Sequence, residues 1–370
     1  MSVDRNQWKG FSVTLLLLLS LASALACSVP VFRYALEKWP ADAYTATVFH
    51  RGPLTAEQQA LARKLSREGL AGQLHANVAV ELVDLAQSPS PAALERWQSL
   101  GQTTLPWLVI NFPKAARLPD AIVSAPLSEA AIRQGLDSPA RQEIVRRLAR
   151  GDSAVWVLLE IGDPARDDAT ATLVESRLNY LAGVLKLPAL DPADIANGLV
   201  NVPAGGLQLA FSIVRVPRTA PAEAAFTQML LGSEGDLRDL REPMVFPVFG
   251  RGRALYALAG QGITHETLDE AAGFLIGRCS CQVKEQNPGV DLLLAADWDK
   301  LLKAQTSAEQ GVTRTGQRST PAPETVTIAG GASSTTATNP SAQQHDNALW
   351  LAVAGAAAAL LAGAFWFRRG

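Results

Sequence analysis

Long apolar segments at the two ends of the chain confine the part that can fold as a globular protein to the residues between them. Near the N-terminus, Arg5 and Lys9 precede an apolar run that closes with Ala24-Leu25-Ala26. A basic start, an apolar centre and small residues before a cleavage point are the pattern of an export signal. We therefore expect residues 1–26 to be a signal peptide that directs the chain out of the cytoplasm.

The apolar segment at the other end covers residues 348–367 and is followed by Arg368 and Arg369. About 20 apolar residues suffice to cross a bilayer as a helix, and basic residues stay on the cytoplasmic side. The pattern predicts a single transmembrane helix, a cytoplasmic tail at 368–370, and a bulk of the chain that is periplasmic or otherwise extracytoplasmic. The same shape is also typical of a C-terminal sorting signal that is later removed, and that alternative stays open.

A segment rich in Ser, Thr, Ala, Gly, Pro and Gln, residues 305–347, precedes this apolar end. Large apolar residues are rare in it, so it cannot bury enough surface to offset its ordering entropy. We expect it to be a disordered linker, which we call the tether. About 280 residues remain to fold, and that length is enough for two ordinary domains.

Composition limits the partners that the chain can have. Its 370 residues include 33 Lys and Arg against 35 Asp and Glu, a formal net charge of −2. Nowhere does the sequence show the basic excess that neutralising a phosphate backbone requires, so we expect no nucleic-acid partner. We expect contact with the membrane through the C-terminal helix, and with a protein or peptide outside the cytoplasm.

Apolar runs typical of buried strands alternate with helical patterns through the first half of the folding part, which predicts an α/β fold. Thr55 and Gln58 form a capping-box pair at the start of one helix. The near-continuous apolar run at 77–85 is typical of a strand buried on both faces. Strands are expected at 44–49, 77–85, 105–112 and 120–125, and helices from 55, at 92–100 and from 128.

The second half repeats this alternation from residue 154. Strands are expected at 154–160 and 207–216, followed by a hairpin of 243–249 and 253–258 around Gly250-Arg251-Gly252. Helices are expected at 168–187, 221–231, 264–276 and 290–303. A basic stretch ends the first half, and we interpret it as a solvated helix face, with a docking surface for an acidic partner as the alternative. Its residues are Arg141, Arg146, Arg147 and Arg150.

The order strand–helix–strand–helix–strand–strand–helix of the first half resembles that of thioredoxin-like domains. Val48-Phe49-His50-Arg51-Gly52-Pro53 lies where such proteins have a strand followed by their Cys-Gly-Pro-Cys turn. Thr104-Leu105-Pro106-Trp107 looks like their cis-proline loop. The second half is similar but looser. The resemblance implies two thioredoxin-like α/β/α domains, 27–150 and 151–304, and a cis peptide before Pro106 that faces the Arg51-Gly52-Pro53 turn.

The chain departs from that family at the residues that carry its chemistry. Thioredoxin catalysis needs a low-pKa thiolate at a helix N-terminus and a second thiol that resolves the mixed disulfide. Arg51 and Leu54 stand where the thiols would be, so we expect a cleft that binds a peptide and performs no redox catalysis. The residues expected to form this binding cleft are His50, Arg51, Gly52, Pro53, Pro106 and Trp107.

The three cysteines, Cys27, Cys279 and Cys281, are too few for a disulfide scaffold. Cys27 follows the signal peptide where bacterial lipoproteins carry their lipid, so lipidation is one expectation and ordinary cleavage the other. Cys279 and Cys281 can form a disulfide with each other or with Cys27, perform redox work, hold copper, or stay inert. The chain also resembles exported bacterial membrane proteins of uncharacterised activity that share its Cys-Ser-Val-Pro-Val-Phe start and a late Cys-x-Cys.

These observations predict a non-catalytic, membrane-tethered protein that binds or assembles with a partner outside the cytoplasm and uses no cofactor. The sequence contains no complete catalytic motif; Gly232-Ser233-Glu234-Gly235, for example, lacks the spacing of a nucleophile elbow. Its four histidines complete no four-ligand zinc set with the cysteines, so any metal stays unknown. The alternative is a thiol redox or copper-handling protein that uses Cys279 and Cys281.

Overall fold

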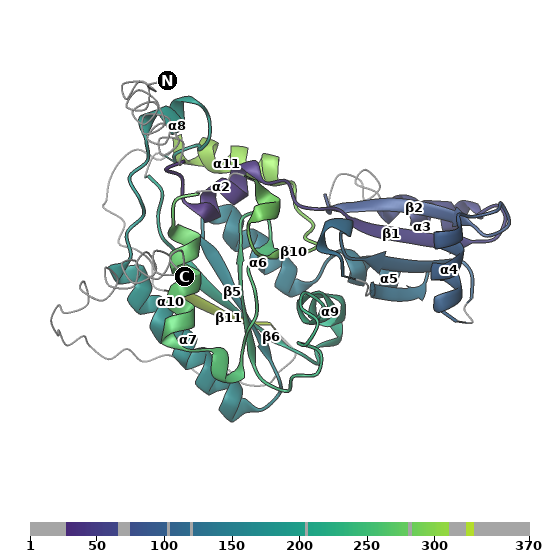
Figure 1. The fold of residues 1–370 in the computed structure, drawn as a ribbon. Coiled ribbons are helices and arrows are strands. Elements are labelled where there is room, and N and C mark those ends of the chain that lie inside the picture. Colours follow the sequence, from purple (N-terminus) through teal and green to yellow (C-terminus); the bar gives the residue numbers. More distant parts are fainter. Residues whose placement is uncertain are drawn as a thin grey trace, which may run out of the picture. The chain divides into compact units, whose positions relative to one another are not determined.

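The structure is a computed structural model that describes residues 27–65, 75–101, 104–118, 121–203, 206–279, 283–310 and 323–328, without the side chains of 305–310. Within these residues the chain forms two mixed sheets with helices packed against them (Figure 1), which confirms the predicted α/β class. The expected signal peptide, transmembrane helix and cytoplasmic tail lie outside the described residues.

The first sheet has four strands in the order β2-β1-β3-β4. They are β1 (Tyr44–His50), β2 (Val78–Asp84), β3 (Trp107–Asn111) and β4 (Ala121–Pro126). The central strand β1 runs parallel to β2 and antiparallel to β3, and β4 runs antiparallel to β3. Alternation along β1 sends Tyr44, Ala46 and Val48 into the main hydrophobic core.

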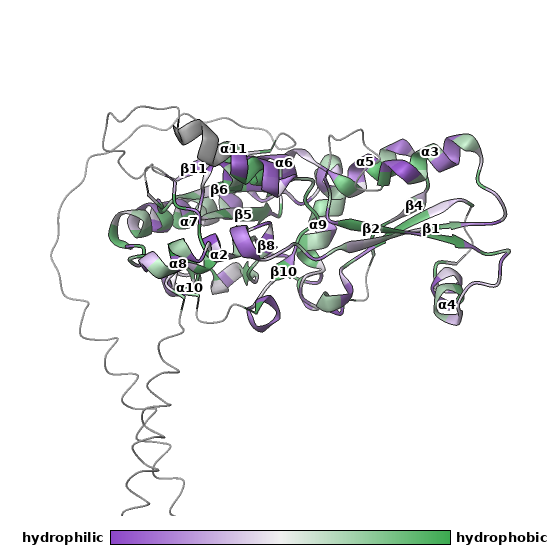
Figure 2. Cartoon of the chain, turned by 90° about the horizontal axis from the view of Figure 1, so that it is seen from above, coloured by the Kyte–Doolittle hydropathy of each residue, from purple (hydrophilic) through white to green (hydrophobic). Residues whose placement is uncertain are grey.

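Helices α3 (Ala56–Leu65) and α5 (Glu129–Leu136) cover one face of this sheet (Figure 2). The predicted capping box is present at the start of α3. The Thr55 amide donates to the Gln58 side-chain oxygen at 3.0 Å, and the Gln58 amide donates to the Thr55 hydroxyl at 3.2 Å. The Ser128 hydroxyl caps α5 in the same way, by accepting from the Ala131 amide. Local capping chemistry therefore places both helices where the sequence predicts them.

The other face of the first sheet is covered only lightly, and this overturns the prediction that 77–85 is buried on both faces. Helix α4 (Pro91–Ser99) lies on that face and has no buried residue; its main apolar contact is between the rings of Trp97 and Phe49, 5.4 Å apart. Strand β2 is also an edge strand, and 55% of Leu82 is exposed. Strand β2 is exposed because it lies at the edge of the sheet, and the sequence of a strand does not indicate whether that strand will be at an edge.

The second sheet repeats the connectivity of the first. Its order is β10-β8-β7-β5-β6-β11, with β9 paired to β7. Its strands are β5 (Ala154–Glu160), β6 (Phe211–Pro217), β7 (Met244–Phe249), β8 (Arg253–Ala254), β9 (Leu258–Ala259), β10 (Val290–Asp291) and β11 (Glu324–Thr327). Strand β5 runs parallel to β6 and antiparallel to β7, and β8 pairs antiparallel with β7, which confirms the predicted hairpin around Gly250-Arg251-Gly252.

Strand β5 is buried on both faces and separates two hydrophobic clusters. Val155, Val157 and Leu159 join the core that also holds the first sheet, whereas Trp156 and Leu158 join a second cluster. Helices α6 (Pro139–Arg150), α9 (Ala224–Leu231) and α11 (Trp298–Gln310) supply the first of these cores. Helices α2 (Val31–Lys38), α7 (Pro164–Val184) and α10 (His265–Ile276) supply the second.

Helix α2 belongs to the second sheet although it comes first along the chain. It packs against α10 and β7, and the amide of Val31 donates to the carbonyl of Gly277 at 3.0 Å. The domain expected at 27–150 therefore contributes its first helix to the core of the other half. A contact between residues so far apart in sequence leaves no local signal.

The helix predicted over 290–303 begins only at Trp298, and Val290 and Asp291 form the edge strand β10 instead. The buried Asp291 carboxylate accepts hydrogen bonds from Arg253 at 2.9 Å and from Lys284 at 2.5 Å. The Tyr44 hydroxyl in β1 donates to the Asp291 carbonyl at 2.9 Å. These partners hold the segment extended and tie it to both sheets, so charge pairing overrides the helical pattern here.

Part of the expected tether is ordered as the edge strand β11. It pairs parallel with β6, and its neighbour Ile328 is buried. Arg147 on α6 donates to the Glu324 carbonyl at 2.7 Å, and Arg150 pairs with the Glu324 carboxylate at 2.7 Å. The alternation of polar Thr325 and Thr327 with apolar Val326 and Ile328 was the available signal, hidden by the Pro- and Thr-rich sequence around it.

The basic stretch on α6 is a solvated face only in part: Arg146 and Arg150 are exposed as predicted, whereas the other two arginines are buried. Arg141 is fully buried and donates to the carbonyls of Gly135 and Gln134, at 2.8 and 2.7 Å, at the end of α5. Burial lowers the pKa of Arg141 to about 10. Arg147 is equally buried and bonds Glu143. Both side chains therefore join neighbouring elements and are not available to dock a partner.

Candidate functional site

The turn after β1 and the start of β3 meet at one edge of the first sheet, which we call the first-sheet edge (residues 50–54, 84–86 and 105–107). The antiparallel register places Phe49 opposite Trp107, so His50, which ends β1, and Pro106, which directly precedes β3, lie at the same edge of the sheet. The Leu105–Pro106 peptide is cis, as predicted. The structure therefore brings together the two halves of the predicted cleft, which are far apart in the sequence.

Asp84, at the end of β2, holds the turn of this edge in place. Its carboxylate accepts hydrogen bonds from the amides of Ala86 and Gly52, both at 2.9 Å, and these bonds lower the pKa of Asp84. His50 Nδ1 lies 2.8 Å from the Gly52 carbonyl oxygen. Sequence analysis missed Asp84, although a carboxylate at the carboxyl end of a parallel strand is a usable signal.

The side chains of the first-sheet edge combine apolar rings with one exposed guanidinium. Arg51 and Pro53 are exposed, whereas His50, Pro106 and Trp107 are half-buried. Trp107 donates from Nε1 to the Ser124 hydroxyl at 3.0 Å, which fixes its ring. The Asp84 carboxylate is occupied by backbone amides, and the turn contains no Cys, Ser or Thr nucleophile between His50 and Leu54. The edge offers apolar rings and one guanidinium, with no nucleophile and base pair.

The corresponding edge of the second sheet also has no cysteine in its first turn, and an ion pair lies beside that turn. The Asp167 carboxylate accepts from the amides of Ile161 and Gly162, at 3.0 and 2.9 Å, in the turn after β5. Arg166 on α7 pairs with Glu242, which lies just before β7. At both edges, a carboxylate accepts a hydrogen bond from a backbone amide of the turn after the first strand. The edges differ in that the Arg166–Glu242 ion pair lies beside this turn in the second sheet.

Cys27 and Cys279 lie near each other in the second hydrophobic cluster. Residues around Pro30 pair antiparallel with those around Arg278, and the Cys279 amide donates to the Val29 carbonyl at 2.9 Å. The thiols are 3% and 1% exposed, respectively, and burial raises the pKa of Cys27. A buried thiol with a raised pKa is a poor nucleophile. Cys281 lies outside the described residues.

The segment that carries Cys27 is fixed by hydrogen bonds to α8 (Pro192–Ala196) and its start. The Ser28 amide and hydroxyl donate to the Asp194 carboxylate at 2.7 and 2.5 Å, and the Asp191 amide donates to the Ser28 hydroxyl at 2.7 Å. A lipid on the Cys27 sulfur would have to leave this packed cluster to reach a membrane. Lipidation of Cys27 stays an open expectation.

Neither the described residues nor known proteins assign an activity to the chain. Within the described part of the chain, no helix is long and apolar enough to span a membrane, and no three His, Cys, Asp or Glu side chains gather as a metal site would require. No protein-family model matches the chain, and no curated protein matches its sequence. The function of the chain therefore has to follow from its own geometry.

Proposed function

We propose that this chain is a membrane-tethered binding protein that works outside the cytoplasm and has no catalytic activity of its own. The shared connectivity of the two sheets supports a reading of both halves as thioredoxin-like: in each, the first strand lies between a parallel second and an antiparallel third strand, and the fourth pairs with the third. Localisation rests on the sequence patterns at the two ends.

One observation carries the proposal: β1 ends and β3 begins at the same edge of the first sheet, so the Arg51-Gly52-Pro53 turn and Pro106 are on the edge where a thioredoxin-like protein would hold its dithiol. Arg51 and Leu54 occupy the two thiol positions. Thiol exchange is chemically impossible without sulfur, whereas the open edge and its rings remain able to bind. An extended peptide is the ligand that such an edge fits, with Arg51 placed to pair with an acidic group on it.

The alternative, redox or copper chemistry at Cys279 and Cys281, requires a thiol that reaches solvent or a soft metal. Cys279 is 1% exposed and packs in the second cluster with Cys27. Burial of this kind favours a structural role for Cys279. We therefore rank binding at the first-sheet edge above thiol chemistry.

Site-specific photocrosslinking in cells that make the full-length protein tests this proposal. A photoreactive phenylalanine analogue replaces Ala86, which is exposed at the first-sheet edge and is not one of the expected binding residues. The control carries the same analogue at Tyr180 on α7, which is 50% exposed. We expect a discrete adduct with one protein or peptide from position 86 and none from position 180. Absence of an adduct at 86, or the same adducts at both positions, would contradict binding at this edge.

A further inference from the structure

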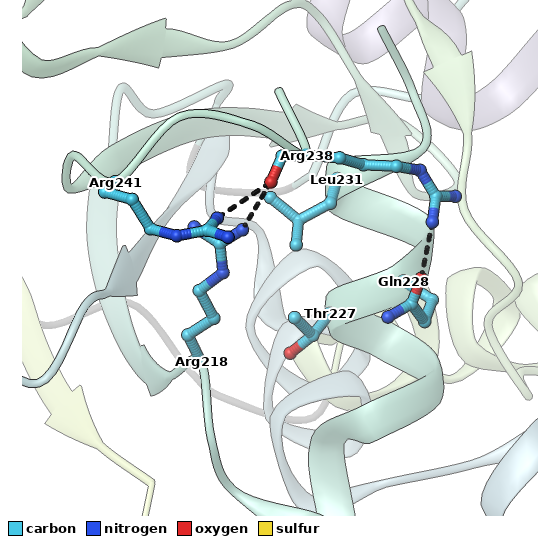
Figure 3. A pocket seen from close by; sticks show the side chains of 6 residues that line it. All are labelled: Arg218, Thr227, Gln228, Leu231, Arg238 and Arg241. Carbon is cyan, nitrogen blue, oxygen red and sulfur yellow. Dashed lines mark hydrogen bonds between the residues drawn. The ribbon is translucent and has the colours of Figure 1, made fainter. Parts of the chain in front are cut away.

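A basic cavity opens beside the second sheet, away from the residues that carry the proposed function. Its volume is about 280 Å³, and its lining residues are Arg218, Thr227, Gln228, Leu231, Arg238 and Arg241 (Figure 3). Three of these six residues are arginines. This volume lies just below the range of about 300–1,000 Å³ that is typical of ligand pockets, so the cavity suits a ligand group that is smaller than a drug-sized molecule.

The cavity lies where α/β sheets usually bind their ligands. Arg218 directly follows β6, and its amide donates to the Glu160 carbonyl at the end of β5, at 3.0 Å. Arg241 lies just before β7, which starts at Met244. The carboxyl ends of two parallel strands and the start of the antiparallel one therefore converge on it. Crevices at this position are the preferred ligand sites of open α/β sheets.

Backbone carbonyls hold two of the guanidinium groups together. Arg218 donates to the carbonyls of Leu240 and Arg238, at 2.8 and 3.1 Å, and Arg241 donates to the same Arg238 carbonyl at 2.9 Å. Figure 3 shows the Arg218 and Arg241 side chains converging on that oxygen. Burial lowers the pKa of Arg218, and the nearby charge of Arg241 lowers it further.

Two like charges held side by side repel each other, and an anion between them would offset that repulsion. Among the described residues, no carboxylate forms an ion pair with Arg218 or Arg241. Arginines of α6 and β6 differ, since Arg147 pairs with Glu143 and Arg215 with Glu160. Arg218 and Arg241 therefore carry positive charges that no carboxylate of the described residues neutralises.

A buried hydroxyl supplies a second, independent sign of a ligand. Thr227 on α9 is 4% exposed, and its hydroxyl has no hydrogen-bond partner among the described residues. A threonine within a helix commonly bonds the carbonyl one turn before it, and a buried polar group without a partner is costly. Thr227 lines the cavity beside Gln228, whose side-chain oxygen accepts from Arg238 at 2.8 Å. A ligand oxygen in the cavity would satisfy the hydroxyl.

We propose that this cavity binds the phosphate group of a small phosphate ester. Arg218 and Arg241 would donate to the phosphate oxygens, the Thr227 hydroxyl would complete its hydrogen bonds, and Leu231 would contact the organic part. Two uncompensated guanidinium groups match a dianion, which a phosphate monoester is near neutral pH. The ester could be a soluble metabolite or the headgroup of a membrane lipid, because both present the same group.

Calorimetric titration of the full chain in nanodiscs of neutral phosphatidylcholine tests the proposal. The soluble ligands that are titrated are inorganic phosphate, glycerol 1-phosphate and succinate, which is a carboxylate dianion. A second set of titrations compares the binding of glycerol 1-phosphate in nanodiscs with and without phosphatidic acid. We expect glycerol 1-phosphate to bind more tightly than succinate. Competition by phosphatidic acid would assign the site to a lipid headgroup, and its absence to a soluble ester. Absence of phosphate binding in every arm, or equal binding of succinate, would overturn the proposal.

Matched variants separate a built site from general charge attraction. Arg218→Gln and Arg241→Gln should each weaken glycerol 1-phosphate binding by about tenfold, the loss expected for one charge-assisted hydrogen bond. Arg133→Gln removes the same charge from an exposed position on α5 and should leave the affinity unchanged. An equal loss in Arg133→Gln and Arg218→Gln would contradict a specific site.

Thr227→Val gives a readout that protein stability alone cannot mimic. Valine has the same shape without the hydroxyl, so the variant should unfold at an equal or higher temperature, because it removes a buried group without a partner. Its affinity for glycerol 1-phosphate should nevertheless fall by about fivefold. A variant that binds as tightly as the wild type would exclude the Thr227 hydroxyl from the site and overturn the proposed geometry.

Discussion

Charged residues fix more of this structure than their place in the sequence indicates. Arg141 and Arg147 look like members of a solvated basic face in the sequence, yet both are fully buried. Asp84 looks like an ordinary strand end, yet it binds two amides of the first-sheet edge. The contacts of Asp84 with Gly52 and of Arg147 with Glu324 join segments that are distant in sequence, so no local pattern predicts them.

Glu143 on α6 should make the stability of the fold sensitive to acid. Hydrogen bonds from Arg146, and then from Arg147, lower the pKa of Glu143 from 4.5 to about 2. A lowered folded-state pKa gives stability that is present above the unfolded value of 4.5 and is lost as the pH falls toward 2. Glu143→Gln should therefore be less stable than the wild type by about 1–2 kcal/mol at neutral pH, with the difference vanishing near pH 2.

Urea unfolding across this pH range measures that difference in the free energy of unfolding. The matched control is Glu95→Gln, which removes an exposed carboxylate on α4 and should change stability little at any pH. A difference between wild type and Glu143→Gln that stays constant down to pH 2 would contradict a role for the ionised carboxylate.

Helices and strands that have capping residues or a periodic pattern in their own sequence were predictable. Elements whose burial or conformation depends on neighbouring elements were not. Thr55 with Gln58, Ser128 and Thr264 cap helices where the sequence predicts them. Strand β5 is buried as its apolar run indicates. Strand β2 has a similar run but is an edge strand, so its exposure depends on the absence of a neighbour. At the first-sheet edge, family resemblance predicted His50 with Pro106, whereas Asp84 was missed although it follows the usable signal of a carboxylate at a strand end.

Strand β11 should contribute measurably to stability, although it lies within the expected tether. The Ile328 amide donates to the Arg215 carbonyl at 3.0 Å, so by alternation the Val326 amide also faces β6. Val326→Pro removes that donor and should lower the free energy of unfolding by about 2–3 kcal/mol. Hydrogen exchange of the β6 amides should accelerate in parallel. Thr335→Pro, later in the tether, is the control, and an equal effect of the two substitutions would contradict an ordered β11.

The whole molecule combines two sheets of the same connectivity with one continuous core between them. That core includes Tyr44 and Val48 of the first sheet as well as Val155 and Phe246 of the second. Local patterns predicted the repeat, because each half has its own strand and helix signals. They could not predict that α2 and β10 tie the halves together, since those contacts join the two ends of the described chain.

A disulfide-reductase assay tests most directly whether the first-sheet edge is a binding edge without thiol chemistry. It measures how fast the protein reduces a disulfide in a test protein when a dithiol supplies the electrons. We predict that the wild type leaves the rate at background. Arg51→Cys with Leu54→Cys converts the turn to Cys-Gly-Pro-Cys and should raise the rate by about tenfold or more. Two results would contradict this assignment. One is a wild-type rate above background that is lost in Cys279→Ser; the other is a double variant that forms its 51–54 disulfide and still reduces the test protein only at the background rate.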